Sequence, residues 1–123
     1  MGQDIRPKTV ICDIDGTLIK HCGDICKQHQ ILDPEILLPG TLDKIKEWDK
    51  NGYRIILVTG RRESTRKQTE EQLTHLGILY DQLIMGVSGG VRVLINDLKP
   101  NKEEPTAIAV NLKRNQGIGD IDV

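Results

Sequence analysis

The sequence predicts an α/β protein, a three-layer α/β/α sandwich built on a mostly parallel, Rossmann-like sheet. Short continuous apolar runs alternate with segments of helical spacing, and this order favours parallel strands joined by crossover helices. The runs lack the alternating polarity of a sheet with one wet face, so we expect helices on both faces. With 123 residues, the chain can form one core, and we predict a single domain over 1–123.

Apolar, β-branched runs mark the expected strands. The first covers Thr9 to Cys12 and ends at Asp13, and the second covers Tyr53 to Val58. Three further short strands are expected in DQLIMG (81–86), VRVLIND (91–97) and TAIAVNL (106–112). The chain then ends in GIGDIDV, for which we predict a loose segment.

Two helices are expected between these strands. In LPGTLDKIKEWDKNG, Thr41 is the predicted N-cap, apolar residues recur at helical spacing, and Asn51-Gly52 ends the helix. RRESTRKQTEEQLTHLG is polar at its start, has apolar residues only in its last turns, and is predicted to stop at Gly77. The sequence thus has the strand–helix–strand order that a parallel sheet requires.

Residues 18–35 show no clear period and are predicted to form a short flap or loop insert. The stretch HCGDICKQH contains His21, Cys22, Cys26 and His29, and histidine and cysteine are the residue types that most often bind zinc. Because Cys-x3-Cys with one flanking histidine on each side is not a standard zinc spacing, we favour a flap that touches the substrate.

Composition excludes several classes of function. The net charge of −1 and only three aromatic residues argue against a nucleic-acid surface. No apolar run approaches membrane-spanning length, and the N-terminal Met-Gly-Gln-Asp lacks the pattern of a secretory signal. Three cysteines, an odd number, favour free thiols in the cytoplasm.

Polar residues close three of the expected strands: Asp13, Thr59 and the pair Asn96-Asp97. The carboxyl ends of parallel strands gather ligands, so these side chains are expected to converge. Asp13 and Asp15 stand one residue apart at the end of an apolar run, where like charges repel and lose hydration. A bound divalent cation would compensate for both costs.

The motifs VICDIDGTL, IILVTGR and VLIND, in this order, resemble those of the aspartate-nucleophile phosphatases of the haloacid dehalogenase (HAD) superfamily. The resemblance extends from Thr9 to about Pro100, and the first motif is its most specific part. Neither gap between the motifs is long enough for a cap domain, so the chain resembles the small capless type.

The resemblance implies a role for each aspartate. Asp13 would be the nucleophile that forms an aspartyl-phosphate, and Asp15 would serve as general acid and base. Mg²⁺ would be held by the Asp13 carboxylate, the Asp15 backbone carbonyl and the Asn96-Asp97 pair. Many relatives have two acidic residues at this last motif, and the uncharged Asn96 is expected to lower metal affinity.

The resemblance also implies that the Thr59 hydroxyl and the Gly60 backbone N–H bind phosphate oxygens. The family needs a cation nearby, usually a lysine shortly before the last motif, where this chain has only Arg92. Arg61, directly after Thr59-Gly60, is favoured for substrate phosphate. Lys67 and Lys99 are further candidates.

The expected function is therefore a Mg²⁺-dependent phosphomonoester hydrolase acting on a small phosphorylated metabolite such as a sugar phosphate. Capless relatives leave the site open, so an assembly of identical chains is one expected means of restricting access. Polynucleotide-end phosphatases share the Thr-Gly-Arg feature, although charge and aromatic content disfavour nucleic acid. The alternatives are a non-catalytic phosphate-binding scaffold and a receiver-like signalling domain. A receiver domain would need an aspartate where Thr59 stands.

Overall fold

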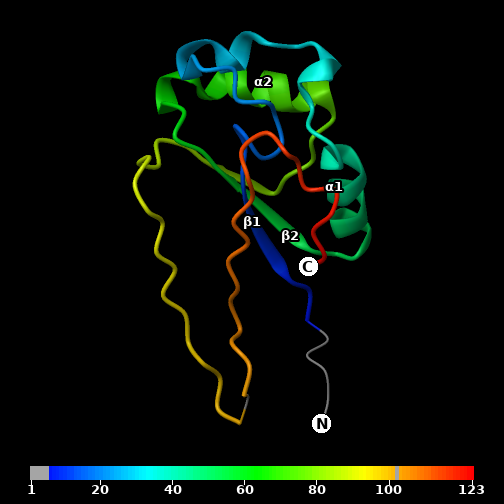
Figure 1. The fold of residues 1–123 in the computed structure, drawn as a ribbon, viewed down its shortest axis with the longest axis vertical. Helices are drawn as coiled ribbons and strands as arrows, with labels where there is room; N and C mark the ends of the chain where they lie inside the picture. The colour runs from blue at the N-terminus through cyan, green and yellow to red at the C-terminus, as the bar shows by residue number, and fades with distance from the viewer. Residues whose placement is uncertain (1–5, 102) are drawn as a thin grey trace.

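The structure is a computed structural model that describes residues 6–101 and 103–123. It contains a parallel sheet in the order β1-β2-β3, formed by β1 (Thr9–Asp13), β2 (Arg54–Val58) and β3 (Gln82–Ile84). Helix α1 (Thr41–Lys50) joins the first two strands, and α2 (Arg66–Leu76) joins the last two (Figure 1). Three 3-10 turns complete the described elements: η1 (Ile25–Gln30), η2 (Pro34–Ile36) and η3 (Glu63–Thr65). The α/β class and the first three expected strands are confirmed.

The two faces of the sheet differ in how well they are covered. The side chains of Cys12, Leu57 and Leu83 lie in register on one face and join the core with Ile45 and Trp48 of α1. The opposite face contains Ile11 and Ile84, which are 54% and 45% exposed. This distribution describes a sheet covered on one face, so the predicted third layer is not confirmed.

Helix α1 begins at Thr41, the residue that was predicted to be its N-cap. The N-cap is Gly40, at φ 84°, and Thr41 is already helical. The hydroxyl of Thr41 donates to the backbone carbonyl of Leu18 at 2.8 Å instead of capping the helix. The prediction of Thr41 as N-cap was therefore wrong, because its side chain forms a hydrogen bond with a residue distant in sequence. The predicted end is confirmed, since Asn51 is the C-cap.

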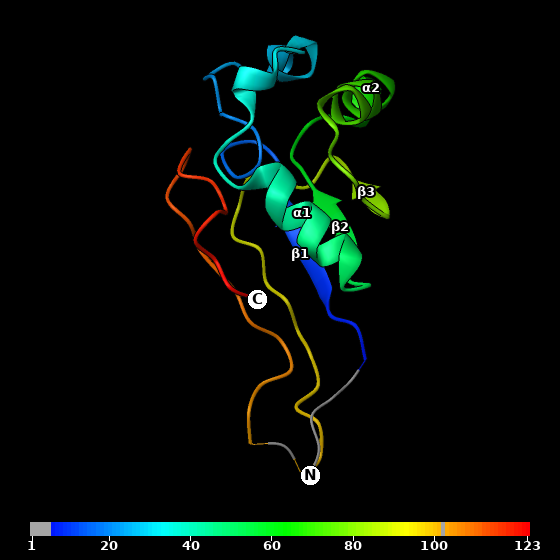
Figure 2. The same ribbon diagram turned by 90° about the vertical axis from the view of Figure 1, so that its right-hand side faces the viewer.

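Helix α2 places polar residues among its buried ones. Its buried face contains Thr69, Gln72, Leu73 and Leu76, and Gly77 ends the helix at φ 82°, as predicted. Figure 2 shows α1 lying across β1 and β2, and α2 lying above β3. Within the described part of the chain, no helix has the length and apolarity needed to cross a membrane.

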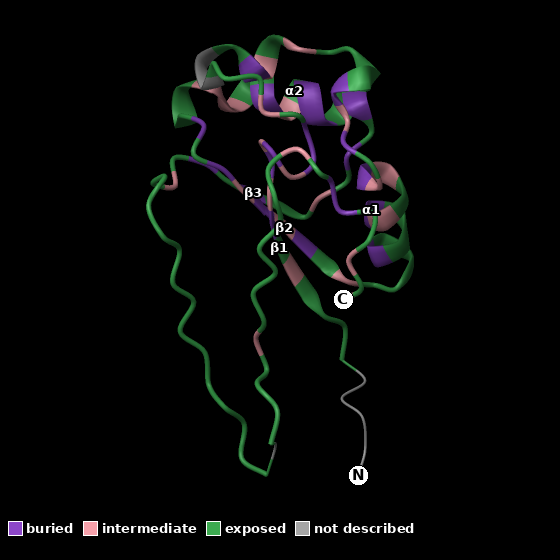
Figure 3. Ribbon diagram, viewed as in Figure 1, coloured by how far each residue is buried: buried purple, intermediate pink, exposed green. Residues whose placement is uncertain are grey.

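The two strands expected in 91–97 and 106–112 are not formed, which corrects that prediction. These residues form an extended segment, here called the arm (residues 91–112). The arm runs away from the sheet and helices, here called the body, and then turns back toward them (Figures 1 and 2). Its aliphatic side chains are exposed, with Val91 at 95% and Ile95 at 91% (Figure 3). A strand needs a neighbouring strand to pair its backbone groups, and within the described residues none lies beside the arm.

The C-terminal segment is packed rather than loose, contrary to the prediction. Ile118 is 1% exposed, and the N–H groups of Ile118 and Gly119 both donate to the carbonyl of Pro39 at 3.1 Å. The backbone of Gly119 lies so close to Gly40 that a Cβ added to Gly40 would lie 2.2 Å from the Gly119 Cα. This close contact therefore requires a residue without a side chain at position 40.

We expect Gly40→Ala to destabilise the protein more than Gly52→Ala. Both glycines have positive φ, 84° and 76°, but an added Cβ at Gly52 meets nothing within 4 Å. Backbone strain alone should cost about 1–2 kcal/mol at Gly52, and overpacking should add about 1–3 kcal/mol at Gly40. Urea unfolding of both variants measures the difference. Equal losses would show that the C-terminal segment does not pack on Gly40.

Candidate active site

Asp13 lies at the carboxyl end of β1, at the edge of the sheet where ligands of such folds bind. Its side chain is 38% exposed, and Arg92 approaches it from the arm, with Nη1 3.6 Å from Oδ1. Burial raises the pKa of the Asp13 carboxyl above its ordinary value, although the backbone N–H of Ile14 and the charge of Arg92 oppose the shift. Repulsion from Asp15 raises this pKa further. The two carboxyl groups therefore interact electrostatically.

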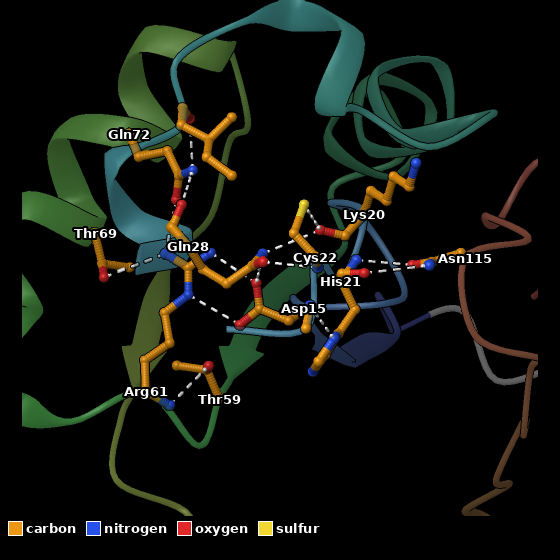
Figure 4. A network of polar contacts seen from close by, with 12 residues as sticks. Asp15, Lys20, His21, Cys22, Gln28, Thr59, Arg61, Thr69, Gln72 and Asn115 are labelled. Atoms are coloured by element: carbon orange, nitrogen blue, oxygen red, sulfur yellow. Dashed lines mark hydrogen bonds and ion pairs between the residues drawn. The ribbon is translucent and has the colours of Figure 1, made fainter. Parts of the chain in front are cut away.

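Asp15 lies in the turn that follows β1 and is held by two partners. Arg61 binds both of its oxygens, with Nε 2.9 Å from Oδ2 and Nη2 2.8 Å from Oδ1 (Figure 4). Gln28 donates a further bond to Oδ1 at 2.9 Å. The side chains of Arg61 and Asp15 are only 1% and 6% exposed. This bidentate pair determines the orientation of the Asp15 carboxylate.

Arg61 is itself oriented by α2. Its Nη1 donates to the Gln72 side chain at 2.6 Å and to the Thr69 hydroxyl at 3.3 Å. The amide of Gln72 donates in turn to the carbonyls of Gln28 and Ile31, both at 2.7 Å (Figure 4). This network ties the Asp-x-Asp turn to α2 and to the 18–35 insert.

The sequence reasoning missed Gln28, Thr69 and Gln72 as parts of this network. One signal was available for two of them. Thr69 and Gln72 stand four residues before Leu73 and Leu76, on the face of α2 that its apolar residues mark as buried. A buried polar side chain needs a partner, so a polar group on that face indicates a network. We found no equivalent signal for Gln28.

Thr59 and Gly60 lie at the end of β2, beside Asp13. The Thr59 side chain is 1% exposed, and its hydroxyl accepts the backbone N–H of Arg61 at 3.1 Å. A Cβ added to Gly60 would lie 3.2 Å from the carbonyl of Val87. The short loop after β2 is therefore tightly held beside the loop after β3.

The candidate lysines lie elsewhere. Lys67 is exposed on α2 and lines a shallow hollow with acidic Glu70 and Glu71. Lys99 is exposed beyond the extended 91–97 segment of the arm. Among the described contacts none joins either lysine to Asp13 or Asp15, whereas Arg92 does approach Asp13.

Asn96 and Asp97 lie on the arm, both exposed, and their contacts are local. The Asn96 amide donates to the Thr106 hydroxyl at 2.7 Å, and that hydroxyl donates to the Asp97 carbonyl at 2.8 Å. No group of three His, Cys, Asp or Glu side chains among the described residues could hold a metal ion. The predicted Mg²⁺ ligands also include the Asn96 amide and the Asp15 backbone carbonyl, so the Mg²⁺ site that the resemblance implies stays a prediction.

The insert places its polar residues around the Asp15 network. The backbone N–H of Cys22 donates to the Gln28 side chain at 2.8 Å, and that of His21 donates to the Asn115 side chain at 2.7 Å. His29 lines a separate hollow beside α2. The side chain of Cys26 lies outside the described residues, as do Met1 to Asp4, where a secretory signal was expected to be absent.

We expect the thiols of Cys12 and Cys22 to differ strongly in reactivity. Burial raises the pKa of Cys12 to about 12, and the neighbouring Asp13 adds to this shift, whereas Cys22 is exposed. The thiolate is the reactive form, so iodoacetamide at pH 8 should label Cys22 and leave Cys12 unmodified in the folded protein. Peptide mass spectrometry of native and urea-unfolded samples measures this. Equal labelling of the two cysteines in the native protein would contradict the packing described here.

Comparison with known proteins supplies a family match. A family model described as "PITM 1-3, LNS2 domain" matches residues 10–102. Two solved structures, titled "Structure of Pnkp1/Rnl/Hen1 complex" and "Structure of the Pnkp1/Rnl/Hen1 RNA repair complex", contain chains that are each 34% identical to this one. They cover 76% and 75% of it with TM-scores of 0.56 and 0.55.

The present chain spans 32% and 30% of the length of those two solved chains, which is about a third. A crystal structure of an MCSG target from Vibrio cholerae is 21% identical, with a TM-score of 0.48. The match covers 76% of this chain and 84% of that one.

Proposed function

Because the chain belongs to the family of the PITM 1-3 LNS2 domain, a HAD-like phosphatase fold, we propose that it is a phosphomonoester hydrolase of the small type without a cap domain. One observation carries the proposal. A partly exposed carboxylate, Asp13, ends the first strand beside a buried carboxylate, Asp15, that a bidentate arginine orients. A nucleophile next to an oriented acid–base group is the arrangement that covalent catalysis requires.

The proposed reaction has two steps. An Asp13 oxygen attacks phosphorus, the bond to the leaving oxygen breaks, and an aspartyl-phosphate forms on Asp13. Water then attacks that phosphorus, which releases inorganic phosphate and restores the carboxylate. Asp15 is the proposed donor of a proton to the leaving oxygen and acceptor of a proton from the water.

The neighbouring residues have distinct proposed roles. Arg61 and Gln28 position Asp15, because their donors are directed at its oxygens rather than at open space. This assignment replaces substrate binding as the proposed role of Arg61. Gly60 and Thr59, at the adjacent strand end, remain the proposed phosphate-binding groups. Arg92, 3.6 Å from Asp13, is the proposed contact for a phosphoryl oxygen, and it is preferred to Lys67, which is exposed beside Glu70 and Glu71.

HAD-like phosphatases generally use Mg²⁺, and we propose that this protein does so too. The ion would reduce repulsion between the two carboxylates and the incoming phosphate. We also propose a cytoplasmic location, since the described thiols of Cys12 and Cys22 are free.

Two substrate classes are proposed. A small metabolite such as a sugar phosphate agrees with a net charge of −1 and few aromatic residues, which provide little to hold a polynucleotide. A phosphorylated RNA end is the second candidate, because the chain is 34% identical to part of a protein in an RNA repair complex. Only the second class should show binding that weakens steeply with salt.

The experiment is a phosphate-release assay with p-nitrophenyl phosphate, sugar phosphates and oligoribonucleotides that carry a terminal phosphate at either end. We expect release that depends on Mg²⁺ and stops with EDTA. Preference for an oligoribonucleotide at low salt would favour the second class. A stable phosphoprotein without turnover would support a receiver-like domain, and binding of phosphate without either result would support a scaffold.

A further inference from the structure

The described residues leave two apolar surfaces uncovered. One is the arm, where Val93 and Ile95 are 79% and 91% exposed. The other is β1, which pairs with β2 along one edge only. Among the described residues, no strand pairs with the free edge of β1, and Ile11, on the uncovered face of this strand, is 54% exposed. An unpaired edge with apolar side chains is a template for another strand.

The arm is held at both of its ends and is not a loose tail. At one end Arg92 lies 3.6 Å from Asp13, and just past the other the N–H of Asn115 donates to the Gly16 carbonyl at 2.8 Å. Between these points the arm runs from the carboxyl edge of the sheet past the amino end of β1 (Figures 1 and 2). Residues 93–100, when extended, span about 26 Å, against about 17 Å for β1.

The arm also contains the two residues missing from the candidate site. Asn96 and Asp97 are exposed on it and bonded only to arm residues in the described contacts, so no described contact joins them to Asp13. The unfilled edge of β1 and the incomplete site lie side by side. One strand added to that edge could therefore change both.

We propose that the arm of one copy pairs with the free edge of β1 in a second copy and places its Asn96 and Asp97 beside Asp13 of the partner subunit. Each active site of the resulting dimer is then built from two chains. This composite site rests on the proposed function, whereas the pairing of the arm with β1 does not.

A second copy fits the arm because one chain carries both complementary surfaces. In a two-fold dimer whose two β1 strands are antiparallel, the carboxyl end of the partner's β1 faces the arm. The contact is then reciprocal, because each arm pairs with β1 of the other chain. Eight arm side chains are exposed aliphatic groups. At about 60–120 Å² each, two arms would bury about 1,000–1,900 Å², which is the size of a stable interface.

The first test measures mass by light scattering after size exclusion. We expect a dimer for the wild type and a monomer for the double variant Val93→Asp, Ile95→Asp. Leu79→Asp is the matched control, because Leu79 is 46% exposed on the body and its variant should remain a dimer. A wild type that is monomeric up to about 100 μM, or a double variant that is still dimeric, would overturn the proposal.

The second test is complementation between two inactive chains. Asp13→Asn and Asp97→Asn are co-expressed with different tags, and the heterodimer is isolated by two affinity steps. If the site is composite, one of its two sites is intact, so we expect about half the wild-type rate, while each homodimer is inactive. Mn²⁺ binding, followed by electron paramagnetic resonance, should show two ions per wild-type dimer and one per heterodimer.

The outcomes separate this inference from the proposed function. An active wild type with an inactive, Mn²⁺-free heterodimer would mean that each chain completes its own site, which overturns the inference. A wild type inactive on every phosphomonoester would overturn the proposed function. In that case the mass and the Mn²⁺ stoichiometry would still decide whether the arm is exchanged and brings ligands to its partner.

Discussion

Asp13→Asn is expected to reduce phosphate release at least about a thousandfold, as loss of a nucleophile does in other covalent catalysts. The amide of asparagine is almost isosteric with the carboxylate but cannot form the aspartyl-phosphate. Because Asp13 is partly exposed and contacts Arg92 at 3.6 Å, the change should leave the fold intact. The assay compares initial rates of the two proteins under identical Mg²⁺ and substrate concentrations.

The thermal stability of Asp13→Asn shows whether the variant is folded, and the raised pKa of Asp13 predicts the direction of its change. Burial raises this pKa above its ordinary value of 3.8, so the folded state favours the protonated form. That contribution to stability is fully present below the pKa of the unfolded chain and is lost as the pH rises through the folded pKa. At pH 7 the ionised carboxylate therefore destabilises the fold, and Asp13→Asn should unfold at the same or a higher temperature.

The same shift predicts a pH profile. Only the ionised carboxylate attacks phosphorus, so the wild-type rate should fall as the pH decreases through the raised pKa of Asp13 in the free enzyme. The profile of kcat/KM against pH measures this midpoint. An Asp13→Asn variant that retains wild-type activity, or a clear loss of its thermal stability at pH 7, would contradict the role assigned to this carboxylate.

Arg61→Ala should have the largest effect on stability, about 3–5 kcal/mol in the free energy of unfolding. The substitution leaves the Asp15 carboxylate, only 6% exposed, without the guanidinium that binds both of its oxygens. It also removes the donor to Gln72 and Thr69. Arg61→Lys keeps the charge but not the planar fork, so its loss should be intermediate. Urea unfolding gives all three values.

The neighbouring Arg62 provides the matched control. It is exposed, and Arg62→Ala should change the free energy of unfolding by less than about 0.5 kcal/mol. A double-mutant cycle with Asp15→Ala should show coupling, because the second substitution costs less once its partner is gone. If Arg61→Ala were as mild as Arg62→Ala, the buried pair could not be what orients Asp15.

Elements defined by local pattern were predicted well from the sequence. The strands at Thr9–Asp13 and Arg54–Val58 and the helix stop at Gly77 follow from apolar runs and a left-handed glycine. Elements that depend on distant partners were not. Thr41 is bonded to Leu18, and the apolar 91–97 segment remains unpaired because no described strand lies beside it.

The candidate site shows the same division. The Asp-x-Asp pair was identified at the end of its strand, because the motif is contiguous in sequence. The role of Arg61 was assigned to substrate binding, since its partners Asp15 and Gln72 lie 46 and 11 residues away. Nothing in a linear pattern shows that a basic residue after a strand turns inward to a carboxylate.

The sequence separation within the Asp15 network has a consequence for synthesis on the ribosome. Asp15 emerges 46 residues before Arg61, and the Gln28 carbonyl emerges 44 residues before the amide of Gln72. Contacts this distant form slowly and only after their loop has closed. Until Arg61 has left the exit tunnel, the nascent chain therefore exposes an unneutralised acidic turn, and the Asp15 carboxylate is fixed in place only once α2 has emerged as well.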